Sequence, residues 1–260
     1  MDRTFLLLLQ FDGGRFAGWQ RQPGQRTVQA EVEAALSQIC GRRVVAHAAG
    51  RTDAGVHAEG LGVSCVVPSG WEPATLRRAL NALLPDDCWI AAAREARRGF
   101  QARKSATGRR YRYEIGTDDA SRSPFRRRWE WALGRPVDVP TLERVATTLA
   151  GEHDFHRLSV RSSSRPHYRC RITEARWTVR GDGTGVRFHV AADRFLHHMV
   201  RMLVGTMVEM SLGRRAESDM TRLLDHDPAV RTSPPAPAEG LYFVGADYPG
   251  DWFVLEGAAS

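Results

Sequence analysis

The residues best suited to chemistry stand in the segment AGRTDAGVH at positions 49–57. Arg51 and Asp53 lie between two glycines, and apolar runs flank the segment on both sides. Glycines permit tight turns and close backbone approach, so a short acidic side chain on such a turn is firmly aimed. Asp53 is therefore a candidate catalytic carboxylate. The alternative is a plain turn in which Asp53 caps its own backbone and Arg51 is solvated, because Asp and Gly are common turn residues.

A second unusual residue is Arg201, a single arginine inside the apolar stretch FLHHMVRMLVG at 195–205. The pattern predicts a long helix over 194–212. A buried guanidinium needs a carboxylate partner, and leaving it alone would cost several kcal/mol. Asp53 would satisfy it, and the pair would keep that carboxylate ionised and oriented. Alternatively, Arg201 reaches solvent along its aliphatic stem.

Other motifs favour structural roles. The glycines at 181, 183 and 185 lie between two strand-like runs and open no helix, so a hairpin turn is favoured over a nucleotide-binding loop. The pairs His153 and His156, and His197 and His198, have no further Cys or carboxylate cluster at ligand spacing. We therefore expect packed or polar histidines and no metal at these pairs.

Strands and helices alternate along the whole chain. Apolar runs predict strands at 5–11, 43–49, 61–67, 89–93, 111–115, 171–179, 186–191 and 241–246. Helical periodicity and capping residues predict helices at 27–39, 73–84, 139–150 and 194–212, with a shorter one after Ser218. We expect two α+β domains with a cleft between them.

The basic stretch 94–112 changes the character of the chain and predicts a domain junction or a substrate-facing loop. The expected organisation is an N-terminal α+β domain over 1–104, a C-terminal α+β domain over 105–248 and a tail over 249–260. The first domain carries the aspartate loop, and the second carries Tyr111 on a strand and Arg201 on a helix.

Composition points to an anionic partner. The chain has 260 residues, with 37 Lys and Arg against 30 Asp and Glu, which gives a formal charge of +7. Arginine guanidinium groups pair with phosphate and stack on bases, so the excess of positive charge suits a nucleic-acid partner. A codon bias toward arginine explains the near absence of lysine equally well, but it does not explain the positive excess.

The sequence supports neither a membrane-spanning or secreted protein nor one built on disulfides or a zinc site. The early apolar run 5–9 is far shorter than the roughly 20 residues that span a bilayer, and it lacks a signal-peptide cleavage site. The four cysteines are widely spaced and form no C-x-x-C pair. They are typical of buried thiols in a reducing cytoplasm, where we expect the protein to reside.

The chain resembles the tRNA pseudouridine synthase A (TruA) family. The resemblance covers nearly the whole chain, in family order, and AGRTDAGVH at 49–57 is its most specific segment. The other matching stretches are FDG at 11–13 with FAGWQRQ at 16–22, ALNALLP at 79–85, RYRY at 110–113, FLHHMVR at 195–201 and APAEGLY at 236–242.

The resemblance implies an isomerase that converts uridine to pseudouridine at positions 38 to 40 of the tRNA anticodon stem-loop. It implies the pseudouridine synthase fold, in which two related α/β-sandwich domains with mostly antiparallel sheets flank a central basic cleft. It also implies a homodimer that needs neither cofactor nor metal. Two alternative hypotheses are the same isomerisation on another RNA or a small uridine nucleotide, and a noncatalytic tRNA-binding or folding module.

The resemblance also assigns site residues. Asp53 matches the catalytic aspartate, Tyr111 the tyrosine that stacks on the target base, and Arg201 the arginine that pairs with the aspartate. The expected RNA-binding residues are Arg51, Thr52, His57, Arg103, Lys104, Arg109, Arg110 and Tyr111. Further phosphate contacts are expected from the basic run 97–112 and from Arg122, Arg126, Arg127 and Arg128. Gln101, Lys104 and Leu158 depart from the family pattern, which leaves the choice of substrate open.

Overall fold

The computed structural model describes residues 1–160 and 167–253. The chain divides into two compact units, each built around its own strands. Among the described residues, the first unit comprises Met1–Thr107 and 243–253, and the second comprises Gly108–Tyr242. The predicted second domain extends to residue 248, but residues 243–248 group with the first unit because β10 lies beside β3.

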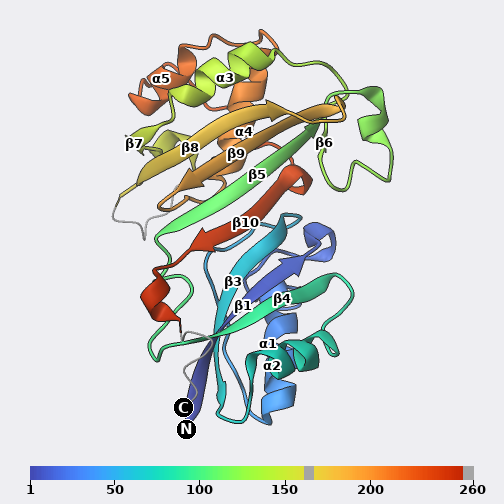
Figure 1. Ribbon diagram of the computed structural model, residues 1–260. Coiled ribbons are helices and arrows are strands. Elements are labelled where there is room, and N and C mark those ends of the chain that lie inside the picture. The colour runs from blue at the N-terminus through green and yellow to red at the C-terminus, as the bar shows by residue number, and fades with distance from the viewer. Residues whose placement is uncertain (161–166, 254–260) are drawn as a thin grey trace. The chain divides into compact units, whose positions relative to one another are not determined.

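In the first unit, neighbouring strands follow the order β4, β1, β3, β10, and β2 pairs with β3 (Figure 1). The helices α1 and α2 lie against one face of β1, β3 and β4. The bounds are β1 Asp2–Phe11, α1 Val28–Cys40, β2 His47–Ala48, β3 His57–Pro68, α2 Pro73–Asn81, β4 Cys88–Ala96 and β10 Leu241–Asp247.

The core of this unit follows the predicted patterns. Val28, Val32 and Leu36, four residues apart on α1, are each at most 1% exposed. Gly41 ends that helix in the left-handed region, with φ of 62°, as the C-cap prediction requires. The apolar run at 5–11 is also confirmed as a buried strand, with Phe5, Leu7 and Leu9 fully buried.

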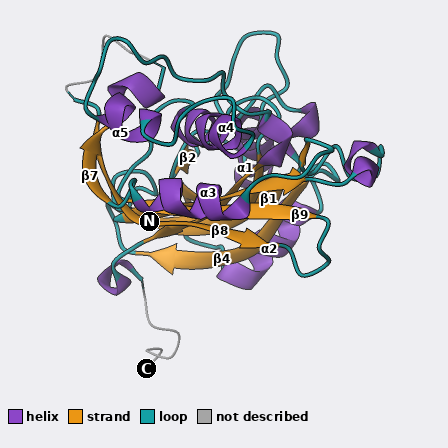
Figure 2. Ribbon diagram, turned by 90° about the horizontal axis from the view of Figure 1, so that it is seen from above, coloured by secondary structure: helices purple, strands orange, loops and turns teal. Residues whose placement is uncertain are grey.

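The second unit contains an antiparallel series of strands in the order β5, β9, β8, β7, and β6 pairs in parallel with β5. The helices α3 and α4 pack together (Figure 2), and the indole N–H of Trp177 on β8 donates to the Met207 sulfur of α4 over 3.5 Å. The bounds are β5 Gly108–Gly116, β6 Trp131–Ala132, α3 Val139–Thr147, β7 Gly151–Asp154, β8 Arg169–Val179, β9 Gly185–Ala192, α4 Met199–Ser211 and α5 Asp219–Leu224.

The β8–β9 connection confirms the hairpin that the glycine pattern predicts. Arg180 donates its backbone N–H to the Gly185 carbonyl over 2.9 Å, and Gly183 has φ of 69°. Glycine adopts this left-handed conformation without steric cost. The glycine-rich segment is thus a turn, and the strand-like runs on both sides pair with one another.

Two predicted elements are shorter than their sequence patterns suggest. The strand expected over 43–49 is reduced to β2, because the N–H groups of Val44 and Ala46 donate to α1 side chains, over 3.0 Å in each case. The helix expected over 194–212 begins only at Met199, because His198 has φ of 60° and cannot continue a helix toward the N-terminus.

The basic stretch 94–112 contains the end of one strand and the start of the next, and residues 97–107 between them form turns and irregular backbone. It begins in β4 and ends in β5, and the division between the two units falls between Thr107 and Gly108. Among the described residues, no helix is long and apolar enough to cross a membrane.

Candidate functional site

In the first unit, Asp53 lies on the connection between β2 and β3. A tight turn follows it, because the backbone N–H of Val56 donates to the Asp53 carbonyl over 3.2 Å. Gly55 within this turn has φ of 81°, a conformation that favours glycine. Asp53 is half-buried, and Arg51 on the same loop is exposed. The loop therefore presents its carboxylate from a constrained backbone, as predicted.

The loop rests on a segment whose role the sequence analysis did not identify. Residues 13–19, after β1, pack directly beneath it, and Trp19 donates its N–H to the Thr52 carbonyl over 3.1 Å. A Cβ atom on Gly18 would lie 2.6 Å from that carbonyl oxygen, and one on Gly13 would lie 2.0 Å from the Val56 carbonyl oxygen. Both glycines are required for this close approach. The sequence shows the glycines after β1, but it does not show which backbone atoms they contact.

His57 and Thr52 support the loop from within. His57 is 1% exposed, and its Nδ1 accepts a hydrogen bond from the Gly13 N–H over 3.1 Å. Thr52 is 7% exposed. The sequence analysis included both as RNA-binding residues. The burial of His57 assigns it instead to positioning, because its ring fixes residue 13 under the loop.

These contacts predict that Gly13→Ala impairs the loop although it removes no functional group. The added methyl must displace the Val56 carbonyl, and overpacking of this kind costs about 1–3 kcal/mol of folding stability. A displacement of about 1 Å in a reacting group lowers turnover by about 10²-fold. We expect a matching loss in single-turnover rate. Gly14→Ala is the control, because its Cβ would meet nothing closer than the Asp12 carboxylate at 3.2 Å. Equal rates in the two variants would contradict the role of the contact.

An ion pair braces the segment under the loop. Arg26 stacks over the ring of buried Phe16 with its guanidinium carbon 4.1 Å from the centroid. It also holds the Asp87 carboxylate through two hydrogen bonds of 2.7 and 2.8 Å. Hydrogen bonding from Arg26 lowers the pKa of Asp87 below its ordinary value.

This pair predicts a pH dependence of stability. Because the Asp87 pKa is lower in the folded than in the unfolded protein, its contribution is complete above the unfolded value of about 3.9. The contribution is lost as the pH falls through the lower folded value. We expect Asp87→Asn to lower the free energy of unfolding at pH 7 by about 1 kcal/mol. The difference between variant and parent should shrink below about pH 4. Thermal melts between pH 3 and 7 measure this, and a difference independent of pH would contradict it.

In the second unit, Tyr111 lies near the start of β5, opposite Val190 of β9. Its ring is half-buried and meets the Phe195 ring edge-on, with centroids 4.9 Å apart. Phe195 lies in the irregular segment before α4, because the helix begins later than predicted. This contact orients the tyrosine ring, and the sequence analysis had not assigned a role to Phe195.

Arg201 lies in the first turns of α4 and is half-buried. Its Nε donates to the Ala236 carbonyl over 2.7 Å, and the Ala236 N–H donates to the Arg201 carbonyl over 2.9 Å. The helix can approach this proline-rich segment because Gly205 has no side chain; a Cβ there would lie 2.3 Å from the Pro234 carbonyl oxygen. The segment thus fixes the base of the arginine side chain.

Tyr113 ties the same segment to β5. Its hydroxyl donates to the Pro237 carbonyl over 2.7 Å, and the side chain is fully buried. Burial raises the pKa of this hydroxyl well above its ordinary value, so it remains a neutral donor. Tyr111 and Tyr113 share one face of β5, since side chains alternate along a strand. Tyr113 therefore helps to hold β5 and the segment that contacts Arg201 in a fixed relation.

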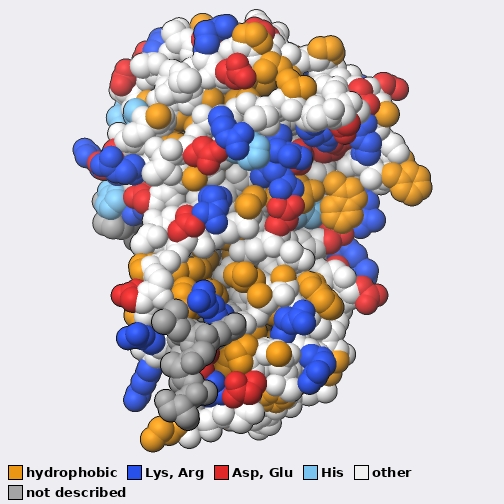
Figure 3. Space-filling view, viewed as in Figure 1, with side chains coloured by type: hydrophobic (Ala, Val, Ile, Leu, Met, Phe, Trp, Pro, Cys, Tyr) orange, Lys and Arg blue, Asp and Glu red, His pale blue; other side chains and the backbone are white. Residues whose placement is uncertain are grey.

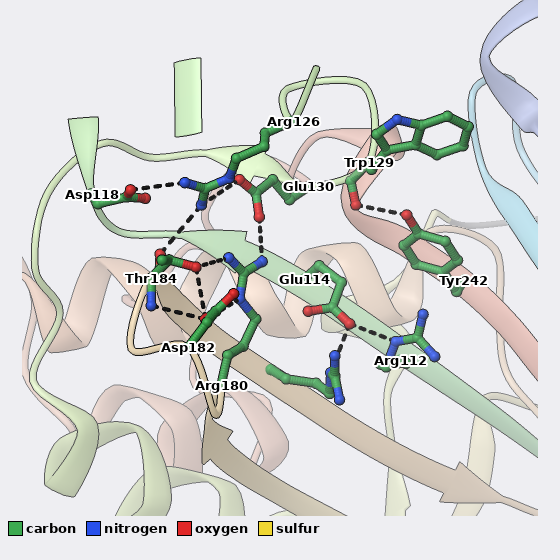
Figure 4. Close-up of polar contacts among 11 residues, drawn as sticks. Arg112, Glu114, Asp118, Arg126, Trp129, Glu130, Arg180, Asp182, Thr184 and Tyr242 are labelled. Atoms are coloured by element: carbon green, nitrogen blue, oxygen red, sulfur yellow. Dashed lines mark hydrogen bonds and ion pairs between the residues drawn. The ribbon is translucent and has the colours of Figure 1, made fainter. Parts of the chain in front are cut away.

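The basic residues that are predicted to bind phosphate differ in their exposure and in their partners. Arg51, Arg103, Lys104 and Arg110 are exposed, whereas Arg109 is half-buried and donates to the Asp193 carbonyl over 2.8 Å. Two others, Arg112 and Arg126, are engaged in internal pairs, and their phosphate contacts stay a prediction. Arg126 pairs with Asp118 at 2.7 Å and with Glu130 at 2.8 Å, and Arg112 pairs with Glu114 at 2.6 Å (Figure 4).

These internal pairs are built around buried carboxylates. Glu130, 3% exposed, binds both Arg126 and Arg180, and Glu114, 6% exposed, binds both Arg112 and Arg187. Basic and acidic side chains therefore lie intermixed over β5 and β9 on the face seen in Figure 3. Arg112 also stacks over Tyr242, whose hydroxyl donates to the Trp129 carbonyl over 2.7 Å. This network stabilises the unit rather than offering unpaired charge.

The predicted residues thus form two groups. Arg51, Thr52 and Asp53 share one loop of the first unit and His57 begins the strand after it, and the same unit contains Arg103 and Lys104. Arg109, Arg110 and Tyr111 share β5 of the second unit, which also contains Arg201 on α4. Close backbone contacts at glycines position the loop that carries Asp53 and the helix that carries Arg201.

Comparison with known proteins gives matches over most of the chain. A family model described as tRNA pseudouridine synthase matches residues 8–103 and 145–249. The chain is 40% identical over 251 residues to tRNA pseudouridine synthase A of Chlorobium luteolum, covering 96% of this chain and 97% of that protein. It is 41% identical over 250 residues to the Thermus thermophilus protein of the same name, covering 95% and 97%. The Myxococcus xanthus protein of that name is 37% identical over 237 residues, covering 90% and 88%.

Proposed function

The chain belongs to the tRNA pseudouridine synthase family, and we propose on this basis that it isomerises uridine to pseudouridine in tRNA. The observation that carries the proposal is the length of the match: relatives at about 40% identity are covered almost from end to end. A shared RNA-binding module alone would match only part of such proteins.

The finer proposal concerns the target. We place the modified uridines at positions 38 to 40 of the anticodon stem-loop, in a basic cleft that the resemblance implies. A paired base cannot be reached inside a stem, so the nucleotide is flipped out at a cost of a few kcal/mol. Stacking on the Tyr111 ring recovers about 1–3 kcal/mol of this cost. The edge-on contact with Phe195 supports this role, because it restrains the ring in advance.

Asp53 performs the central step in this proposal. The N1–C1′ glycosidic bond breaks, the uracil rotates, C5 bonds to C1′, and the C5 proton leaves while N1 gains a proton. Asp53 acts either as a nucleophile on C1′ or as a base that takes a sugar proton to give a glycal. Both routes require an ionised carboxylate. We propose that Arg201 pairs with Asp53 and maintains that state.

The remaining residues bind and hold the RNA. Exposed Arg51, Arg103, Lys104 and Arg110, together with Arg109, contact phosphates and so fix the register of the RNA without reading its sequence. Buried Thr52 and His57 maintain the loop. We propose that the enzyme acts as a homodimer in the cytoplasm and needs no cofactor or metal for this reaction. The four free cysteines are consistent with a reducing compartment.

The direct test is incubation of the purified protein with an unmodified tRNA transcript that carries uridine at positions 38, 39 and 40, followed by mapping of pseudouridine. We expect modification at these positions, and none in a transcript with cytidine there. Modification at other uridines would support the same chemistry on another target. Tight binding without any pseudouridine would support a noncatalytic module instead.

A further inference from the structure

A cluster of metal-ligating side chains lies in the second unit, outside the residues assigned to isomerisation. Asp154 ends β7, His156 begins the 3-10 turn His156–Leu158, and His226 follows α5. One ligand atom from each of the three lies within 4.8 Å of the others. The sequence separates His226 from His156 by 70 positions (226 minus 156), so only the fold brings them together.

The spacing within the cluster suits a metal ion. His156 Nδ1 lies 3.4 Å from Asp154 Oδ1. Two donors that each bind a tetrahedral zinc at about 2.0–2.1 Å are about 3.3 Å apart, so this pair already has the required separation. The His156 and His226 rings lie with centroids 4.3 Å apart. The Asp154 carboxylate is oriented as well, because its Oδ1 accepts the backbone N–H of His156 over 2.9 Å.

His226 occupies a backbone position that favours glycine. Its φ is 67°, and Asp227 N–H donates to the Arg222 carbonyl over 2.9 Å while His226 N–H donates to Leu223 over 3.3 Å. These two bonds form the Schellman motif that ends many helices, in which the left-handed residue is usually glycine. The imidazole at this position carries a conformational cost, and the same conformation directs it to His156.

We propose that Asp154, His156 and His226 bind one divalent transition-metal ion of the zinc type, with water completing the coordination. Two imidazoles and a carboxylate suit Zn²⁺, whereas Mg²⁺ and Ca²⁺ prefer oxygen ligands alone. The ion links the end of α5 to the β7 segment and thereby stabilises the second unit. The proposal is independent of the isomerisation chemistry, because none of its three residues is assigned to that reaction.

The test uses the untagged full-length protein after treatment with EDTA and removal of the chelator. In titration calorimetry we expect one Zn²⁺ ion to bind per protein chain, and we expect this binding to require the three residues of the cluster. We expect it to raise Tm by about 5 °C or more at a hundredfold excess over Kd. Mg²⁺ at the same concentration should give no shift.

His226→Gly separates a ligand role from a structural one. Glycine is favoured at this backbone position, so the variant should fold and, without metal, melt at or above the Tm of the parent. It should lose the Zn²⁺-dependent rise, as should His156→Gln. His47→Gln, which alters an exposed histidine of β2 outside the cluster, should keep it. A parent protein without a Zn²⁺ shift, or an undiminished shift in His226→Gly, would overturn the proposal.

Discussion

Asp53→Asn is expected to abolish pseudouridine formation while leaving tRNA binding intact. The amide has nearly the same size, so the loop and its contacts with residues 13–19 persist, but it can neither attack C1′ nor remove a proton. We expect the single-turnover rate to fall by about 10⁴-fold or more, as in enzymes that lose a central catalytic group. The Kd for the tRNA should change by less than about threefold, because phosphate contacts supply most of the affinity.

The matched control is Asp86→Asn, which removes an exposed carboxylate of the same unit and should leave both rate and affinity unchanged. Turnover by Asp53→Asn near the parental rate would refute the catalytic assignment. Loss of binding together with activity would show instead that the residue maintains the loop.

Arg201→Ala has the second-largest expected effect, and it should act on both catalysis and stability. Removal of the guanidinium deprives the Ala236 carbonyl of its donor and leaves the proposed partner carboxylate without its counter-charge. Losing one member of a buried pair costs about 3–5 kcal/mol, and a half-buried residue should lie at the lower end. We expect turnover to fall by about 10²-fold or more. We also expect a Tm several degrees lower.

Arg214→Ala provides the comparison, because this exposed arginine follows α4 and pairs with Glu209 on the surface at 2.9 Å. Surface pairs contribute about 0–1 kcal/mol, so this variant should behave as the parent. If Arg201→Ala turned over tRNA at the parental rate and retained its Tm, Arg201 would be a solvated side chain, as the alternative interpretation of the sequence holds.

Local patterns predicted those elements whose partners need not be known. The buried apolar run of β1, the apolar face of α1 and the turn at 180–185 follow from local residue pattern and from the backbone freedom of glycine. The loop carrying Asp53 was identified in the same way, because its glycine spacing is local. These features depend on neighbours within a few positions.

Features that depend on distant partners were not predictable. No local pattern indicates that Gly13 and Gly18 lie in close contact with the backbone carbonyls of residues 56 and 52. Nor does one indicate that the Val44 N–H donates to an α1 side chain instead of to a neighbouring strand. Glu114 and Glu130 lie only two and four positions from Arg112 and Arg126, but their second partners, Arg187 and Arg180, are brought near only by the fold. The His156 cluster is the clearest case, since its third member comes from the far end of α5.

In the proposed reaction, Asp53 and Arg201 act as one catalytic pair, and a double-mutant cycle measures their coupling directly. Single-turnover rates on one tRNA transcript are compared for the parent, Asp53→Glu, Arg201→Lys and the double variant, since these milder changes leave a measurable rate. We predict that the double variant loses less than the two single losses combined, with a coupling free energy of about 0.5–3 kcal/mol. Strictly additive losses would mean that the two side chains act independently, and would contradict the proposed pair.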